Sequence, residues 1–291
     1  MATGWTTTGS LADSLDDVRS SARIVREFEG IMPQLVDKKT LGKGIGLTWQ
    51  EVSYAQLTAQ AITETQDLDN PQQLSDTLLT ITPTVVGIET FVTDRVRARI
   101  FAEGLARIGA LAQNAIQRKK DEDGITVLDG ATTSLCGAGT TLASGYVSAA
   151  AARIRGNATE PGLPPLRCVV HGYQIKDFYD ELVAGVGTSV VDAGPTATVF
   201  QNGFKLPIAG VEVYEDGNIT IDSSDDAKGG VFAKEAIVLV QGRAARIVSV
   251  RREERGGGGD SIYHYDEYAY GERSPGNWLY EIYSDAVAPT S

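Results

Sequence analysis

The sequence predicts an α+β protein in which one long helix lies against long β-strands. Three observations predict this class. Residues 82–120 carry apolar side chains at helical spacing, short strands alternate with helices between about 131 and 243, and residues 244–283 contain long stretches of strand character. For the middle segment alone, a mixed α/β arrangement is the alternative.

The predicted spine helix covers residues 82–120. Pro83 suits its first turn with Thr82 as a cap, cations at 118–120 suit its end, and Gly124 supplies a stop. A helix of this length spans roughly 50 Å and needs a long partner, which we expect to be a sheet. An ordinary core helix without functional meaning is the alternative. The apolar positions on one face are Val92, Val96, Ile100, Leu105, Ile108, Ala112 and Ile116.

Composition excludes several classes of protein. The chain has 291 residues, 42% hydrophobic residues and a net charge of −12, so it can form a sizeable core and would repel phosphate backbones. No apolar run approaches the ~20 residues that cross a bilayer, and residues 1–9 do not resemble a signal peptide. We therefore expect neither sequence-specific nucleic-acid binding nor a membrane segment.

Residues 41–81 predict a long hairpin without a core. Strand-like segments at 47–54 and 76–82 are joined by some twenty mostly polar residues. Because a two-stranded hairpin is marginal in water, we expect a projecting arm that becomes stable by lying on another molecule. A disordered surface loop is the alternative. Before it, residues 1–10 suggest an arm and 11–28 a short helix.

The remainder alternates predicted strands and helices. We expect long strands at 244–252 and 261–271, joined by glycines 256–259, and a last strand at 278–283. Because the middle segment interrupts the parts that should pack on the spine helix, their domain is discontinuous. The other expected elements are strands at 125–128, 166–171 and 204–214, helices at 142–154 and 172–183, an acidic loop at 215–230 and a core element at 231–240.

The sequence contains no assembled catalytic constellation. The two histidines, His171 and His264, lie on different segments, and Cys136 and Cys168 match no zinc or redox spacing. Asp121, Asp123 and Asp129 only weakly resemble a calcium loop, because Thr132 occupies the twelfth position. We therefore predict a non-enzyme and assign no catalytic, cofactor-binding or metal-binding residue.

The order of these parts resembles the major capsid protein of tailed bacteriophages, whose fold is named for phage Hong Kong 97. The resemblance covers nearly the whole chain. Its most specific segments are PIAGVEVY at 207–214, GVFAKEA at 230–236, and AYG at 269–271 followed by WLYEI at 278–282.

The resemblance implies four regions. Residues 1–40 would be the N-terminal arm, 41–81 the E-loop that lies over a neighbouring subunit, and 131–243 the inserted axial (A) domain. The peripheral (P) domain would combine 82–130, with the spine helix, and 244–291. Contacts between subunits are then expected in the hairpin and at the start of the spine helix, at Trp49, Tyr54, Leu78, Ile81, Arg95 and Arg99.

The resemblance also implies a function. Copies of the chain would assemble into the hexamers and pentamers of an icosahedral virion shell that encloses double-stranded DNA, after synthesis in the host cytoplasm. Portal, separate scaffolding and decoration proteins are the implied partners, with no cofactor and no membrane. The net charge of −12 would discourage the lumen from gripping DNA. An encapsulin-like compartment and a soluble α+β enzyme are the alternatives.

Overall fold

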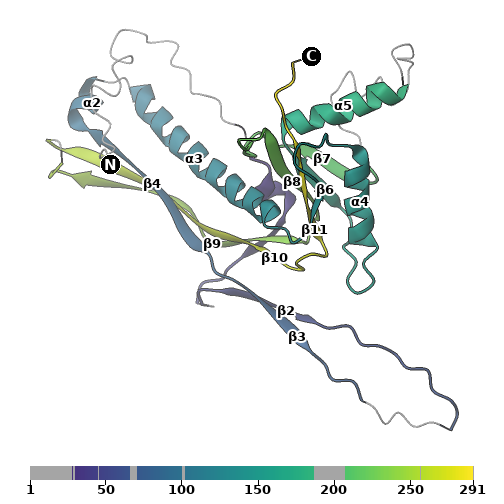
Figure 1. Ribbon diagram of the computed structural model, residues 1–291. Coiled ribbons are helices and arrows are strands. Elements are labelled where there is room, and N and C mark those ends of the chain that lie inside the picture. Colours follow the sequence, from purple (N-terminus) through teal and green to yellow (C-terminus); the bar gives the residue numbers. More distant parts are fainter. Residues whose placement is uncertain are drawn as a thin grey trace.

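The computed structural model describes residues 28, 30–44, 46–65, 71–99, 102–186, 207–255 and 257–290. The helix expected at 11–28 therefore lies outside the described residues, except for Phe28. The molecule is an elongated body built on two sheets, from which a two-stranded hairpin projects (Figure 1).

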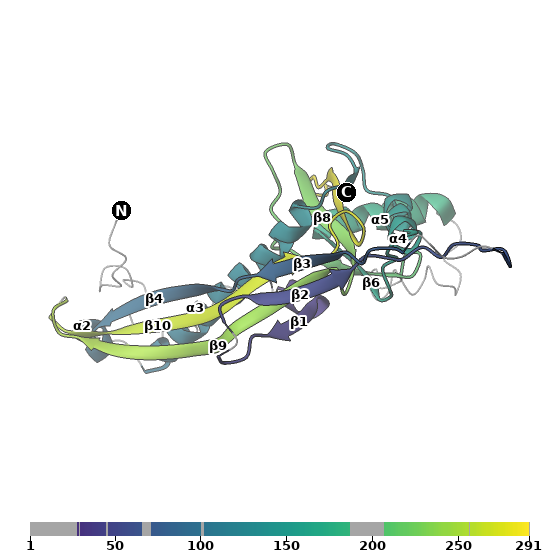
Figure 2. The same ribbon diagram turned by 90° about the horizontal axis from the view of Figure 1, so that it is seen from below.

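A long four-stranded sheet forms one half of the body. Its order is β1-β9-β10-β4, with β9 and β10 forming an antiparallel hairpin and β1 parallel to β9. Viewed from below, β4, β9 and β10 form a long curved band (Figure 2). The predicted strands at 244–252 and 261–271 are confirmed, although β9 begins earlier than expected. The bounds are β1 Asp37–Thr40, β4 Thr84–Thr93, β9 Ile237–Arg252 and β10 Gly259–Glu272.

The spine helix exists, but its predicted start at residue 82 is wrong. Residues 84–93 form strand β4, because this stretch is rich in β-branched side chains that suit a pleated surface. Helix α2 (Asp94–Arg99) follows at once, and the Val96 N–H donates to Thr93 Oγ1 at 3.3 Å. The cap is thus Thr93 and not Thr82.

The predicted end of the spine helix is also wrong. Helix α3 (Ala102–Asp129) continues through Gly124 and includes the strand expected at 125–128. A Cβ at Gly124 would lie 2.9 Å from the Met32 Cβ, so the missing side chain lets another segment approach the helix. By contrast, a Cβ at Gly109 would meet nothing within 4 Å.

A second sheet of five strands forms the other half of the body. Its order is β5-β11-β8-β6-β7, and helices α4 (Ser144–Arg155) and α5 (Gly172–Val186) accompany it. The structure confirms both predicted helices and the buried strand predicted at 166–171. The segment 215–240, predicted as an acidic loop followed by a core element, instead contains strand β8, a turn and the start of β9. The strand expected at 278–283 is β11, which lies here between β5 and β8. The bounds are β5 Ser134–Cys136, β6 Leu166–Val170, β7 Val211–Glu215, β8 Asp226–Ala233 and β11 Leu279–Asp285.

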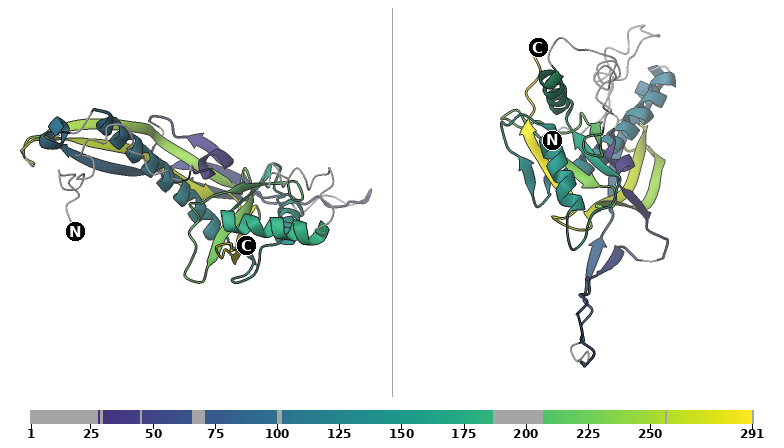
Figure 3. Two further views of the ribbon diagram at one scale, coloured as in Figure 1. Left: turned by 90° about the horizontal axis from the view of Figure 1, so that it is seen from above. Right: turned by 90° about the vertical axis from the view of Figure 1, so that its right-hand side faces the viewer.

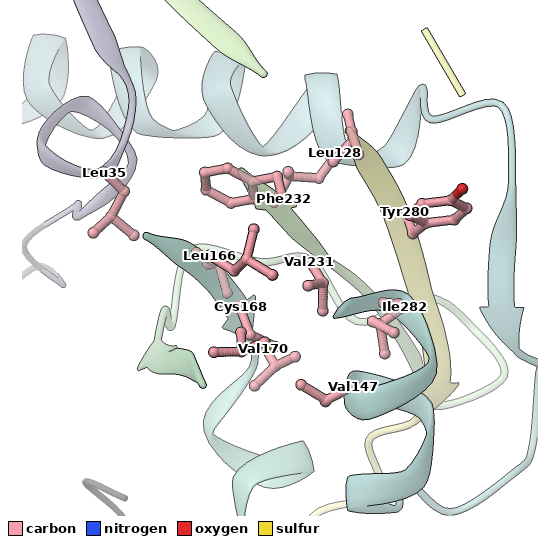
Figure 4. Close-up of a cluster of buried hydrophobic side chains, with 14 of the residues drawn as sticks. Leu35, Leu128, Val147, Leu166, Cys168, Val170, Val231, Phe232, Tyr280 and Ile282 are labelled. Carbon is pink, nitrogen blue, oxygen red and sulfur yellow. The ribbon is translucent and has the colours of Figure 1, made fainter. Parts of the chain in front are cut away.

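One core joins the two halves. Figure 4 shows Leu128 of α3 directly above Phe232 of β8, with Leu166 and Ile282 in the same cluster. Leu128, Phe232, Leu166 and Ile282 are fully buried. Because α3 packs on β10 and β4 along its length and on β8 near its end, it connects the long sheet to this core.

The projecting hairpin consists of β2 (Trp49–Tyr54) and β3 (Asp76–Ile81), which pair antiparallel. Both strands confirm the prediction from residues 47–54 and 76–82. The right-hand view of Figure 3 shows the hairpin extending away from both sheets. A short helix, α1 (Met32–Leu35), leads into β1.

Candidate functional site

The hairpin has a paired base and an almost unpaired outer part. Its regular ladder runs only from Trp49↔Ile81 to Tyr54↔Asp76. Beyond it, the Ala55 N–H donates to Ser75 O at 2.9 Å and the Gln72 side chain bonds both backbone groups of Thr58. The described chain further out is extended and exposed, so its backbone polar groups are available to a partner.

Apolar side chains of the hairpin face solvent. Tyr54 is 74% exposed, and Val52 and Leu78, which lie opposite each other in the ladder, are also exposed. Exposed apolar side chains are ordinary when single, but a series along one thin arm marks a surface that another molecule covers. The other exposed apolar residues of the arm are Leu47, Leu57, Ile62 and Leu74.

The base of the hairpin is fixed to the body. Ile81 is only 4% exposed and packs on Val238 and Val240, with Trp49 partly buried beside them. Ile81 and Trp49 therefore contact their own subunit and anchor the arm, whereas Tyr54 and Leu78 are free to contact another molecule.

Arg273 clamps this base electrostatically. Its guanidinium bonds Glu51 of β2 at 2.9 Å and Asp37 of β1 at 2.9 Å, and donates to Glu235 O at 3.0 Å. Burial raises the pKa of Asp37, but the hydrogen bond and charge of Arg273, together with Lys39, outweigh this and hold that pKa below its ordinary value. The arm is thus rigidly oriented at its origin.

Arg95 and Arg99 are exposed on α2, at the far end of the long sheet (Figure 2). At this end Arg251 pairs with Asp94, and Arg97 bonds Asp260 at 2.5 Å. The hairpin base contacts β9 at Val238 and Val240, near the opposite end of that strand. The structure therefore separates the two predicted groups of contact residues within one subunit.

The outer half of β9 is a surface that the sequence reasoning missed. Strand β1 pairs with β9 only as far as Gln241, and from 243 to 251 nearly every residue of β9 is exposed. Ile247 is 65% exposed, and Arg246 lies 5.2 Å from the ring centre of Tyr265. Among the described residues this length of β9 has a strand partner on one edge only.

The two segments contain charged residues of opposite sign, and three of the four arginines of β9 form ion pairs within the subunit. Residues 47–81 contain five acidic residues and no lysine or arginine, whereas residues 243–252 contain four arginines and no acidic residue. Charges of opposite sign on apolar surfaces favour and orient association. The acidic residues are Glu51, Glu64, Asp67, Asp69 and Asp76, and the arginines are Arg243, Arg246, Arg251 and Arg252.

The titratable candidates lie apart from one another. The His171 ring accepts from the Tyr173 N–H at 3.2 Å, and burial lowers the pKa of His171. Burial raises the pKa of the Cys168 thiol to about 12, and Cys136 and Cys168 form no disulfide. Asp121, Asp123 and Asp129 all lie on helix α3 and not on a loop.

The described residues form neither a metal-binding cluster nor a membrane-spanning helix. They contain no group of three or more His, Cys, Asp or Glu side chains placed to hold a metal ion. None of the helices formed by the described residues is both long enough and apolar enough to span a membrane.

No family model matches the chain, and no curated protein matches it significantly in sequence. Solved structures do match. The capsid of Helicobacter pylori bacteriophage KHP30 aligns with a TM-score of 0.70 at 11% identity, covering 97% of this chain and 98% of that chain. A chain of Mycobacterium phage Che8 aligns with a TM-score of 0.68 at 16% identity, covering 93% and 97%. The capsid of Cyanophage Pam1 aligns with a TM-score of 0.67 at 10% identity, covering 99% and 100%. The chain therefore has the α+β fold of these phage capsid proteins, which confirms at the level of the fold the resemblance that the sequence indicated.

Proposed function

We propose that this chain is a structural, non-enzymatic shell protein that assembles with copies of itself into the capsid of a tailed bacteriophage. The observation that carries the proposal is the anchored hairpin with exposed apolar side chains, on a chain that aligns over nearly its whole length with phage capsid proteins. A thin arm that exposes Tyr54 and Leu78 gains stability only by covering another molecule.

In this proposal the four regions have the roles that the resemblance implies. Residues 1–40 are the N-terminal arm, 41–81 the E-loop, 82–130 with 244–291 the P domain, and 131–243 the A domain, although β11 (Leu279–Asp285) pairs within the five-stranded sheet of the A domain. The chains form hexamers and pentamers of an icosahedral shell around double-stranded DNA, without sequence-specific contacts. The shell forms in the host cytoplasm together with portal, separate scaffolding and decoration proteins.

We further propose that the hairpin of one subunit lies on the outer half of β9 of the next. Two features support this pairing: the open edge of β9 at 243–251, and the opposite sign of the charged side chains in the two segments, of which Arg246 forms no ion pair among the described residues. Exposed backbone groups on both partners allow strand addition, while Ile247 and Tyr54 supply apolar area. Arg95 and Arg99 would contact a further copy at the end of the sheet.

Negative-stain electron microscopy of the purified full chain, combined with sedimentation velocity, tests this function. We expect closed particles much larger than the 31.0 kDa chain. Particles from infected cells should contain nuclease-protected nucleic acid by absorbance. Closed particles filled with protein cargo would favour an encapsulin-like compartment, and a chain that stays monomeric or dimeric under all assembly conditions would contradict a shell role.

A further inference from the structure

Two buried carboxyl groups meet where the N-terminal segment joins the body. Asp121 comes from α3 and Asp216 from the loop after β7, and both are 0% exposed. Asp121 accepts the Met32 N–H at 2.9 Å and the Asn218 side-chain amide at 2.8 Å. Asp216 accepts the Asn218 N–H at 2.9 Å and the Ile31 N–H. The pair therefore connects residues 31–32, the spine helix and the loop after β7.

One carboxyl oxygen of this pair has no hydrogen-bond donor among the described residues. Ionised carboxylates only accept hydrogen bonds, and Asp216 Oδ2 is buried without a donor among the described residues. Two adjacent carboxyl groups in a buried site cannot both stay ionised without a compensating charge. Burial, and beyond it the hydrogen bond and charge of Asp121, raise the pKa of Asp216 to about 7, although the N–H groups of Asn218 and Ile31 act in the opposite direction.

The described residues supply no such charge. In the part of the chain that the structure describes, no Lys, Arg or His forms an ion pair with Asp121 or Asp216, since the nearest lysines of α3 are engaged elsewhere. Lys119 pairs with Asp123 at 2.5 Å and Lys120 with Asp266 at 3.1 Å.

Among the described residues, the remaining neighbours carry no positive charge that reaches the pair. Residues 31–35 contain no ionisable side chain. From β10, the Tyr270 phenol faces this region, is buried without a hydrogen-bond partner among the described residues, and has a pKa raised by burial and by Asp121. Glu122 on α3 is exposed and pairs with Arg118, and Glu215 beside Asp216 lies against Gly172.

The backbone around the pair is closely packed. A Cβ at Gly30 would lie 2.4 Å from the Asp121 side chain, and a Cβ at Gly217 would lie 2.9 Å from the Phe28 ring. Such close approach leaves no space for the two carboxyl groups to separate without moving Phe28 and residues 30–32.

We propose that Asp121 and Asp216 share one proton and form a proton-dependent clasp, which holds residues 30–32 against α3 and the loop after β7. In the closed state the O–H of Asp216 donates to the Asp121 carboxylate. Loss of this proton to solvent leaves two adjacent carboxylates, whose repulsion weakens the hold on the Ile31 and Met32 N–H groups. The clasp itself does not depend on the proposed function, but its role in setting the position of the N-terminal arm in a shell does.

The sign of the pH dependence follows from the raised pKa. The folded protein binds this proton more tightly than the unfolded chain, so the clasp is fully closed below the ordinary Asp value near 4. Its contribution to stability falls as the pH rises and is lost once the pH passes the folded-state value of about 7. Because the proposed proton lies between the two carboxyl groups, the transition belongs to the pair.

Hydrogen–deuterium exchange of the unassembled full chain between pH 5.5 and 8.5 tests the clasp, after correction for the intrinsic pH dependence of exchange. We expect the peptide that covers residues 30–36 to lose protection by on the order of tenfold across this range. In Asp216→Asn the side-chain amide replaces the shared O–H at every pH, so the loss of protection should disappear. Asp222→Asn is the matched control, because hydrogen bonds hold the pKa of that exposed carboxyl below its ordinary value, outside this range.

Two results would overturn the clasp: constant protection of residues 30–36 in the wild type, or the same pH dependence in Asp216→Asn. Protection at pH 8.5 that is restored by calcium chloride and removed by a chelator would show that the pair holds a cation and would also overturn the shared proton. A far-ultraviolet circular dichroism spectrum checks that Asp216→Asn is folded. The exchange measurement needs no particle, so a failure of assembly would contradict the proposed function and leave this test intact.

Discussion

Replacing Arg273 should detach the hairpin base from the body. In Arg273→Met the apolar stem remains, but Glu51 and Asp37 lose their shared cation and Glu235 O loses a donor. Breaking a fully buried ion pair costs about 3–5 kcal/mol. The Asp37 and Glu51 side chains are 26% and 40% exposed, and water compensates them in part. We therefore expect a loss of about 2–3 kcal/mol in the free energy of unfolding.

Urea denaturation of the unassembled chain measures this loss, with Arg243→Met as the matched control. Arg243 is 64% exposed and its ion pair with Glu267 is 3.8 Å long, so that replacement should cost less than about 0.5 kcal/mol. The Arg273 variant should also assemble poorly, because an arm that is no longer oriented docks less often. Equal unfolding midpoints for the two variants would refute the clamp.

Four further substitutions test the packing of α3, the hairpin contact and the charge pairing. Gly109→Ala should stabilise α3 by about 0.5–1 kcal/mol in the same denaturation assay. Gly124→Ala should be neutral or destabilising by up to about 2 kcal/mol, because its Cβ meets Met32. Equal stabilisation by both substitutions would contradict the packing at Gly124. Tyr54→Ser should change the free energy of unfolding by less than about 0.5 kcal/mol, because the side chain is exposed in the single chain. The same substitution should raise the concentration needed for assembly by about tenfold. A light-scattering assembly curve equal to that of the wild type would count against the hairpin contact. Arg246→Glu should slow assembly by on the order of tenfold, with a smaller difference in 0.5 M salt; an effect that does not depend on salt would argue against charge pairing.

The hairpin and the C-terminal strands could be predicted because each has a strong local signal. Polar composition between 56 and 73 excluded a core for the arm, and the alternation in 261–271 has the period of a strand. The structure bears out both elements as strands.

The predicted bounds of the spine helix were wrong because Pro83 and Gly124, which were read as its start and stop, are weaker signals than the residues around them. Pro83 after Thr82 resembles a helix start, but the β-branched residues that follow favour a strand, and Thr93 provides the cap. Gly124 resembles a stop, yet tertiary packing against Met32 keeps it within the helix.

The surface on β9 and the carboxyl pair could not be predicted because both depend on tertiary position. The arginines and apolar residues of 243–252 do not reveal which strand edge remains open. Asp121 and Asp216 are 95 residues apart, and only the docking of residues 31–32 and the loop after β7 onto α3 brings them together.

We propose above all that the anchored hairpin lies on a neighbouring copy of the chain. Cryo-electron microscopy of particles assembled from the full chain tests it most directly. We expect a closed shell in which residues 49–81 of each subunit lie along the 243–251 segment of the next, with Tyr54 buried. A shell in which both segments remain exposed to solvent, or a chain that forms no shell, would contradict it.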